Sequence, residues 1–248
     1  MKTFKLLLIL SCFVPFLSIA QNPKSVELDL LKAFKKIDYA NSDNSESNDA
    51  FAKKLCDYTR KYPFTISQPF NLLKAEHLDV LSSSDGLFRI YSWDTWTGGT
   101  MHFFENVFQY KLAAKTFSIL DTPKQEGDSR PNYHTIYKFK VGDKTYYLCV
   151  YLTIGSSKDA GQGIQIFTID RGKLNEDTKI IKTKTGLHSQ LYYDYDFFSV
   201  VDWKVRPTIY FDEKLKTIFI PYVESSGKVT HKYITYKFIG PYFEKVIN

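Results

Sequence analysis

The sequence predicts a mainly β protein: an antiparallel β domain of about nine to eleven strands behind an N-terminal segment of two or three helices. β-Branched and aromatic residues dominate after Leu81, and Gly, Asp and Asn turn signals recur among them. Before Leu81, apolar residues recur every three or four positions, which is the period of an α-helix. The chain also holds 20 Phe and 18 Tyr, which predicts an aromatic core. A sandwich, a barrel and a partial propeller all fit such a set of strands.

Residues 1–20 have the features of a signal peptide. Lys2 and Lys5 precede an apolar run, and small residues lead up to an expected cleavage after Ala20. The run is too short for a transmembrane span. We therefore expect export to the periplasm or the outside. In an alternative reading, Ile9 to Cys12 is a loose lipoprotein box and Cys12 carries a lipid anchor.

Residues 21–81 are expected to form the helical segment. Ser25 is expected to cap a first helix, and a polar loop follows from Asn41 to Asp49. Asp49 is expected to cap a second helix, which Pro63 helps to stop. The stretch from residue 69 to 81 fits either a short helix or an edge strand.

Residues 82–248 are expected to form one β domain. Residues 145–154 are apolar on both faces, which predicts a central strand. Residues 155–163 contain three glycines and are expected to be a flexible loop. Alternation or strand-forming composition predicts further strands at 134–141, 164–170, 208–211, 217–223 and 229–239.

The segment "SSSDGLFRIYSWDTWTGGTMHFF", from Ser82 to Phe104, holds the most concentrated site signal. Asp85-Gly86 predicts a tight turn into a strand at 87–93, and the Gly98-Gly99 pair predicts a second turn before a strand at 101–110. Two adjoining strands reversed at this diglycine turn bring Asp94 and His102 to the same end.

We expect Asp94, Trp96 and His102 to gather around the diglycine turn. The residues expected to bind a ligand are Asp85, Arg89, Trp93, Asp94, Trp96 and His102. A catalytic alternative uses Asp94 or Glu105 with His102 for acid–base chemistry. A third reading makes the whole stretch scaffold, with Trp93 in the core and Asp94 bonded to turn amides.

The same stretch resembles a segment, SSSDG..RIYSWDT.TGGTMH, of uncharacterised small exported proteins from Gram-negative, Bacteroidota-type bacteria. No reaction is assigned to that group, so the resemblance implies export and no catalytic role.

Other chemistry has little support in the sequence. The net charge of +6 falls to +4 without Lys2 and Lys5, and the lysines are dispersed, so we expect no nucleic-acid partner. No metal or cofactor motif occurs, and a calcium site at the two carboxylates of "YYDYDFF" (Tyr192 to Phe198) is an alternative to an exposed strand face. Cys56 and Cys149 form either one disulfide or free thiols.

These observations favour an exported binding or accessory module for a glycan, a peptide or an envelope component. One alternative is a hydrolase of envelope or extracellular polymers that uses Asp94 or Glu105 with His102. The other is a structural or interaction protein that docks a partner through its aromatic face.

Overall fold

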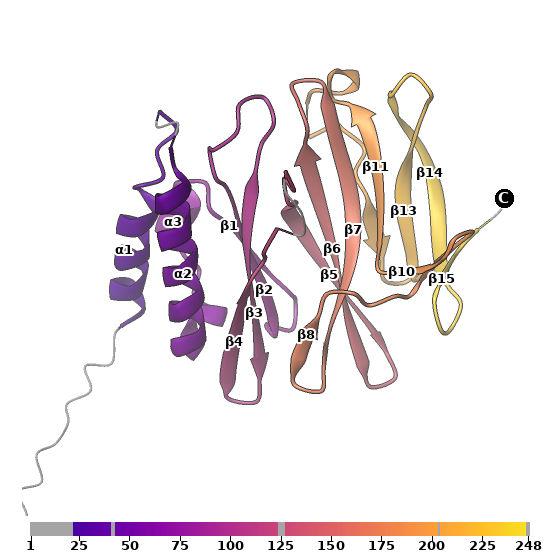
Figure 1. Cartoon of the computed structure of the whole chain (residues 1–248). Helices are drawn as coiled ribbons and strands as arrows, with labels where there is room; N and C mark the ends of the chain where they lie inside the picture. Colours follow the sequence, from indigo (N-terminus) through magenta and orange to yellow (C-terminus); the bar gives the residue numbers. More distant parts are fainter. Residues whose placement is uncertain (1–21, 41–42, 124–126, 203, 247–248) are drawn as a thin grey trace, which may run out of the picture.

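The computed structural model describes residues 22–40, 43–123, 127–202 and 204–246, and the protein is mainly β, with helices confined to its N-terminal part (Figure 1). The predicted signal peptide and the lipid-box Cys12 lie outside these described residues. The helices are α1 (Pro23–Phe34), α2 (Ser45–Lys61) and α3 (Asn71–Ala75). Of the helices in the described ranges, none is long and apolar enough to span a membrane.

Fifteen strands occur in the described residues, more than predicted because several have only three residues. They are β1 (Asp79–Ser82), β2 (Phe88–Asp94), β3 (Phe104–Leu112), β4 (Lys115–Leu120), β5 (Asn132–Val141), β6 (Lys144–Ile154), β7 (Asp159–Asp170), β8 (Lys173–Asn175), β9 (Ile181–Thr183), β10 (Gly186–His188), β11 (Gln190–Asp196), β12 (Tyr210–Asp212), β13 (Thr217–Val223), β14 (Val229–Phe238) and β15 (Phe243–Lys245).

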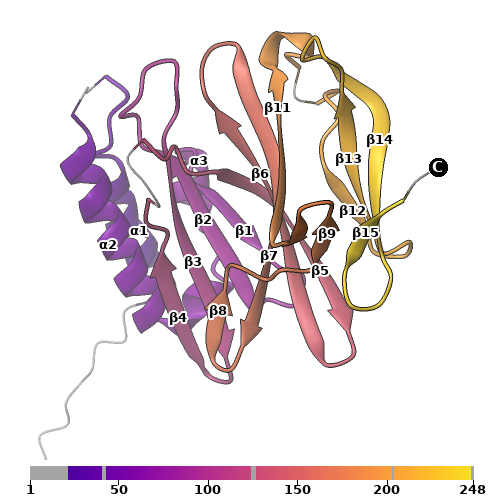
Figure 2. The same cartoon turned by 45° about the vertical axis from the view of Figure 1, so that its right-hand side comes forward.

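These strands form three sheets that stack as layers behind the helices (Figures 1 and 2). The first sheet has the order β1-β2-β3-β4, the second β11-β7-β6-β5 with β8 beside β7, and the third β10-β9-β15-β14-β13-β12. Among the described pairs only β15 and β9 run parallel. No sheet in this part of the chain closes on itself, so the barrel alternative is wrong. Face-to-face packing, as in a sandwich or in neighbouring propeller blades, holds the layers together.

Apolar clusters fill the gaps between the layers, and a small additional one of Ala160, Tyr195 and Val229 lies between the second and third sheets. The helices pack on the first sheet through Leu30, Phe51 and Trp93, among others. Aromatic side chains such as Phe88, Phe108, Tyr147 and Phe167 join the first sheet to the second. A third cluster, including Leu148, Ile166 and Ile218, joins the second sheet to the third. Strand β6 contributes to both of the last two clusters, which confirms the central strand predicted from its two apolar faces.

The helices begin earlier than predicted. The N-cap of α1 is Asn22, whose Oδ1 accepts a hydrogen bond of 3.0 Å from the amide of Ser25, so Ser25 is not the cap. Helix α2 starts at Ser45, inside the predicted loop, and not at Asp49. Asn48 is fully engaged there: its side chain bonds Trp93 Nε1 and the Thr95 carbonyl. These contacts outweigh the loop-like local composition. The ambiguous stretch up to residue 81 holds both α3 and β1.

The predicted flexible loop at 155–163 is wrong for its second half, because β7 begins at Asp159. Gly161 and Gly163 are therefore strand residues. A Cβ atom at Gly161 would lie 2.0 Å from Tyr192 Oη, and one at Gly163 would lie 2.2 Å from Tyr151 Cζ. The glycines are there because two tyrosine rings occupy the space that side chains would need.

The two cysteines of the described residues, Cys56 and Cys149, are buried free thiols, so the disulfide alternative is wrong. Burial raises the pKa of the Cys149 thiol well above its ordinary value. This mid-strand cysteine is consequently a packing residue and not a thiolate nucleophile.

Candidate functional site

Asp94, Trp96 and His102 lie together around the loop that contains Gly98 and Gly99, and we call these three residues the rim. Strands β2 and β3 pair with Asp94 opposite Phe104, and residues 95–103 connect them. The imidazole Nδ1 of His102 is hydrogen-bonded to the carboxylate of Asp94. The other carboxylate oxygen accepts a bond of 2.9 Å from the Trp96 amide. The indole of Trp96 lies 6.1 Å from the imidazole, centroid to centroid, and is 37% exposed. An acid, an imidazole and an indole therefore share one end of the first sheet.

The turn itself is shaped by its own packing. A Cβ atom at Gly98 would lie 1.9 Å from the carbonyl oxygen of Met101, whereas nothing lies within 4 Å of the corresponding position at Gly99. Trp96 has a φ of 53°, in the left-handed region. The hydrogen bond from the Trp96 amide to the Asp94 carboxylate stabilises this backbone conformation, so Asp94 supports the loop as well as the imidazole.

Glu105 does not join this rim. It pairs in register with Trp93, so its side chain lies on the helix-facing side of the first sheet, opposite to Asp94. Its Oε1 lies 3.4 Å from Nη2 of Arg130. The combination of Asp94, His102 and Glu105 is thus divided between two faces of one sheet.

The other three residues predicted to bind a ligand have structural contacts within the protein. Trp93 is 1% exposed and bonded to Asn48. Arg89 is 5% exposed and donates to the carbonyls of residues 65 and 68. Asp85 stabilises the turn at the opposite end of β2, where it accepts from Leu87 N. The structure therefore places Asp85, Arg89 and Trp93 away from the rim that Asp94 and His102 form.

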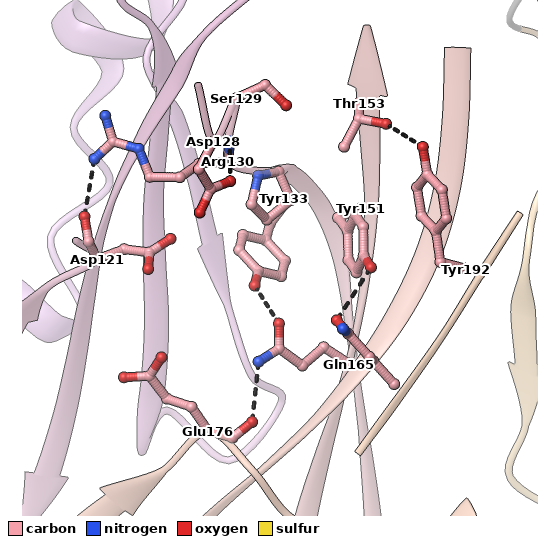
Figure 3. Close-up of a pocket in the computed structure, with 12 residues that line it drawn as sticks. Asp121, Asp128, Ser129, Arg130, Tyr133, Tyr151, Thr153, Gln165, Glu176 and Tyr192 are labelled. Atoms are coloured by element: carbon pink, nitrogen blue, oxygen red, sulfur yellow. Dashed lines mark hydrogen bonds between the residues drawn. The ribbon is translucent and has the colours of Figure 1, made fainter. Parts of the chain in front are cut away.

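A second set of residues lines a cavity of about 210 Å³ on the second sheet, here called the tyrosine pocket (Figure 3). Its polar and aromatic lining comes from Tyr133, Tyr151, Thr153, Gln165, Gln190 and Tyr192. Its charged lining is Asp121, Asp128, Arg130 and Glu176. Strands β5, β6, β7 and β11 each contribute, so the pocket is a feature of the sheet face.

The tyrosines form a row across this sheet (Figure 3). The rings of Tyr151 and Tyr192 are nearly parallel, at 16°, with centroids 6.3 Å apart. Tyr133 stands at 70° to Tyr151 and 5.6 Å from it. Tyr133 and Tyr151 are buried, whereas Tyr192 is 46% exposed. Gly161 and Gly163 allow the two parallel rings to lie across β7, and Tyr192 offers the accessible part of this surface.

Hydrogen bonds orient the polar groups of the pocket. Tyr133 donates to Oε1 of Gln165 at 2.7 Å, and Nε2 of Gln165 donates to the carbonyl of Glu176 at 2.9 Å. The hydroxyl of Tyr192 lies 2.9 Å from that of Thr153. Burial raises the pKa of Tyr192 to about 12, and its one phenolic proton is donated to Oδ1 of Asp194, so towards a ligand this oxygen is an acceptor. The pocket is therefore a pre-oriented set of hydroxyl and amide groups beside aromatic rings.

The segment predicted as the site borders the pocket without lining it. His102 N donates to the carbonyl of Ile154, next to the pocket residue Thr153, at 3.0 Å. Phe104 N donates to the carbonyl of the pocket residue Ser129 at 2.8 Å. The sequence did carry signals for the pocket, the Gly161-Gln162-Gly163 triplet and the tyrosines of "YYDYDFF", but their meaning depends on strands that are far apart in the chain.

Asp194 belongs to that last motif and accepts a hydrogen bond of 2.7 Å from Tyr192. Among the described residues, no group of three or more His, Cys, Asp or Glu side chains is placed to hold a metal ion. A scan against protein-family models finds no match for this chain, and neither does a search of curated proteins or of solved structures. The function must be argued from the geometry of the site.

Proposed function

We propose that this protein is a glycan-binding module whose ligand site is the tyrosine pocket. The observation that carries the proposal is the seating of Tyr151 and Tyr192 over Gly163 and Gly161. Tyr151 is buried beneath this surface, and the 46% exposed ring of Tyr192 offers a flat apolar face of the kind that a pyranose ring can cover. The adjoining amides, hydroxyls and carboxylates supply donors and acceptors for sugar hydroxyls.

The size of the pocket suits one ring. Pockets for drug-sized ligands enclose roughly 300–1,000 Å³, and this cavity has about 210 Å³. We infer that a single residue of a longer glycan enters it, with the remaining chain outside. Export, which the predicted signal peptide implies, would place the module among envelope or extracellular glycans. A peptide ligand is less well supported, because the parallel rings and glycines favour a flat ring over an extended backbone.

The test is a glycan array followed by calorimetric titration of the best ligand. Tyr192→Ala removes the exposed ring and is expected to weaken binding about tenfold, the equivalent of one lost aromatic stacking contact. Tyr233→Ala is the matched control, because Tyr233 is 36% exposed on the third sheet, away from the pocket. No binding to any glycan, or equal affinities for wild type and Tyr192→Ala, would count against the proposal.

A hydrolase acting on the bound glycan is the second candidate, and the Asp94–His102 hydrogen bond favours it. A carboxylate at Nδ1 fixes the imidazole and leaves Nε2 for proton transfer. Glu105 could not assist, since it lies on the opposite face of the sheet. Incubation of the array-selected glycan with wild type and with His102→Gln decides the point. Product release by wild type alone, with binding retained in the variant, would support the hydrolase.

A further inference from the structure

The apolar packing between the second and third sheets contains a cavity of about 270 Å³, here called the interlayer cavity. It is bounded by β11, the edge strand of the second sheet, and by β13, β14 and β15 of the third. Strand β11 lies beside β13 in both views (Figures 1 and 2). Ile220 belongs to the larger apolar cluster between these sheets, and Val223 packs against the smaller one. The cavity therefore lies where the packing passes from one cluster to the other.

The wall of the interlayer cavity is mainly aliphatic. Its aliphatic members come from both sheets and include Leu191, Ile209, Ile220, Val223 and Ile234. Ile209 and Ile220 are only 2% and 8% exposed, so the cavity reaches the core between the layers. Protein interiors are normally packed with few voids larger than a water molecule, and apolar cavities exclude water and accept apolar ligands. The wall therefore suits a ligand that is itself aliphatic.

Lys245 is the single charged side chain among the described residues that line this cavity. It pairs in register with Tyr236, which packs against the larger interlayer cluster, so Lys245 lies on the inward face of the third sheet. Lys245 is exposed, and no described residue forms an ion pair or a hydrogen bond with its ammonium group. A cation on the same sheet face as an aliphatic wall complements an alkyl chain that ends in an anionic group.

The surroundings of Lys245 also favour an anion. An adjoining cavity of about 470 Å³ shares Tyr236 and Lys245 with the interlayer cavity and adds Lys182, Lys184 and Glu244. Lys182 and Glu244 form an ion pair of 2.8 Å, which leaves the charges of Lys184 and Lys245 uncompensated by the other lining residues. A cationic headgroup would be repelled here, whereas a carboxylate would be attracted.

We propose that the interlayer cavity binds an aliphatic monocarboxylate, with its alkyl chain against Ile220, Val223 and Ile234 and its carboxylate at Lys245. Pockets for drug-sized ligands enclose roughly 300–1,000 Å³, and this cavity has about 270 Å³, so it takes one chain and not a two-chain lipid. The proposal does not depend on glycan binding, although Tyr192 lines both this cavity and the tyrosine pocket.

Calorimetric titration with decanoate, below the concentration at which it forms micelles, tests the proposal, with decyltrimethylammonium as the oppositely charged analogue. We expect wild type to bind decanoate more tightly than the cation and to lose about fourfold in affinity for each methylene removed from the chain. Lys245→Gln should weaken decanoate binding about fivefold, the equivalent of one exposed ion pair. Lys237→Gln, an exposed lysine on the outer face of β14, should leave the affinity unchanged and controls for net charge.

A bulkier side chain in the wall tests the position of the alkyl chain. Ile234→Phe puts a ring into the cavity and should weaken decanoate binding about tenfold or more. Thr235→Phe adds the same ring to the outer face of β14 and should leave the affinity unchanged. The proposal is overturned by no decanoate binding to wild type, by equal binding of decyltrimethylammonium, or by unchanged affinity in a folded Ile234→Phe. If Ile234→Phe does not fold, unchanged affinity in Lys245→Gln overturns it.

Discussion

His102 and Asp94 are hydrogen-bonded across the mouth of the loop that joins β2 to β3. The same carboxylate accepts a hydrogen bond from the amide of Trp96, so the Asp94 side chain contacts both Trp96 and His102. The pair was predicted from the two strands and the diglycine turn. Its structural role can be measured separately from any catalytic one.

We predict that Asp94→Ala destabilises the fold by about 1–2 kcal/mol, because two hydrogen bonds are lost together. The measurement is urea unfolding, with Asp57→Ala as control. Asp57 is exposed and forms a surface ion pair with Arg60, so its loss should cost less than about 0.5 kcal/mol. Equal costs for the two variants would mean that the Asp94 bonds contribute nothing.

The glycines of β7 give a second prediction. Gly163→Ala should destabilise the fold by about 1–3 kcal/mol, since the new methyl overlaps the buried ring of Tyr151. Gly99→Ala is the control, because its Cβ would meet nothing within 4 Å. Thermal unfolding of both variants checks the difference. A Gly163→Ala protein as stable as Gly99→Ala would show that Tyr151 does not need that space.

A third prediction concerns the contact between α2 and the first sheet. Asn48→Ala leaves both the Trp93 indole N–H and the Thr95 carbonyl without their buried partner. We expect a loss of about 2–3 kcal/mol in the free energy of unfolding. Chemical unfolding followed by Trp fluorescence measures it. Ser45→Ala, an exposed substitution at the start of the same helix, should cost much less.

The stability of the protein should also depend on His134. Burial lowers the pKa of this imidazole to about 4, below the ordinary value of 6.5. The unfolded chain therefore binds the proton more readily, and stability should fall as the pH drops from 6.5 towards 4, by on the order of 2 kcal/mol. His134→Gln should lose less stability over this range. Parallel slopes for wild type and variant in urea titrations at several pH values would contradict the assignment.

Structural features are predictable from the sequence where the residues that determine them lie close together in the chain. The apolar residues on both faces of 145–154 were enough to identify β6, and the turn residues at 85–86 and 98–99 were enough to bring Asp94 to His102. These features depend on neighbours within about twenty residues.

The remaining features depend on residues that are distant in the chain. Gly161 and Gly163 indicate a loop when read alone, and they become strand residues only beside Tyr151 of β6 and Tyr192 of β11. Glu105 looked like a partner for His102, but the pleat turns it to the other face, towards Arg130. Periodicity carries no information about which strands become neighbours. The tyrosine pocket could not be predicted for this reason.

The most direct test of the account is saturation-transfer NMR on the complex with the glycan selected by the array. Irradiation of the aromatic protons of wild type should transfer saturation to the ring protons of one sugar residue. Tyr192→Ala should lose most of that transfer, while Tyr233→Ala keeps it. Undiminished transfer in Tyr192→Ala would contradict the claim that the tyrosine pocket holds the sugar.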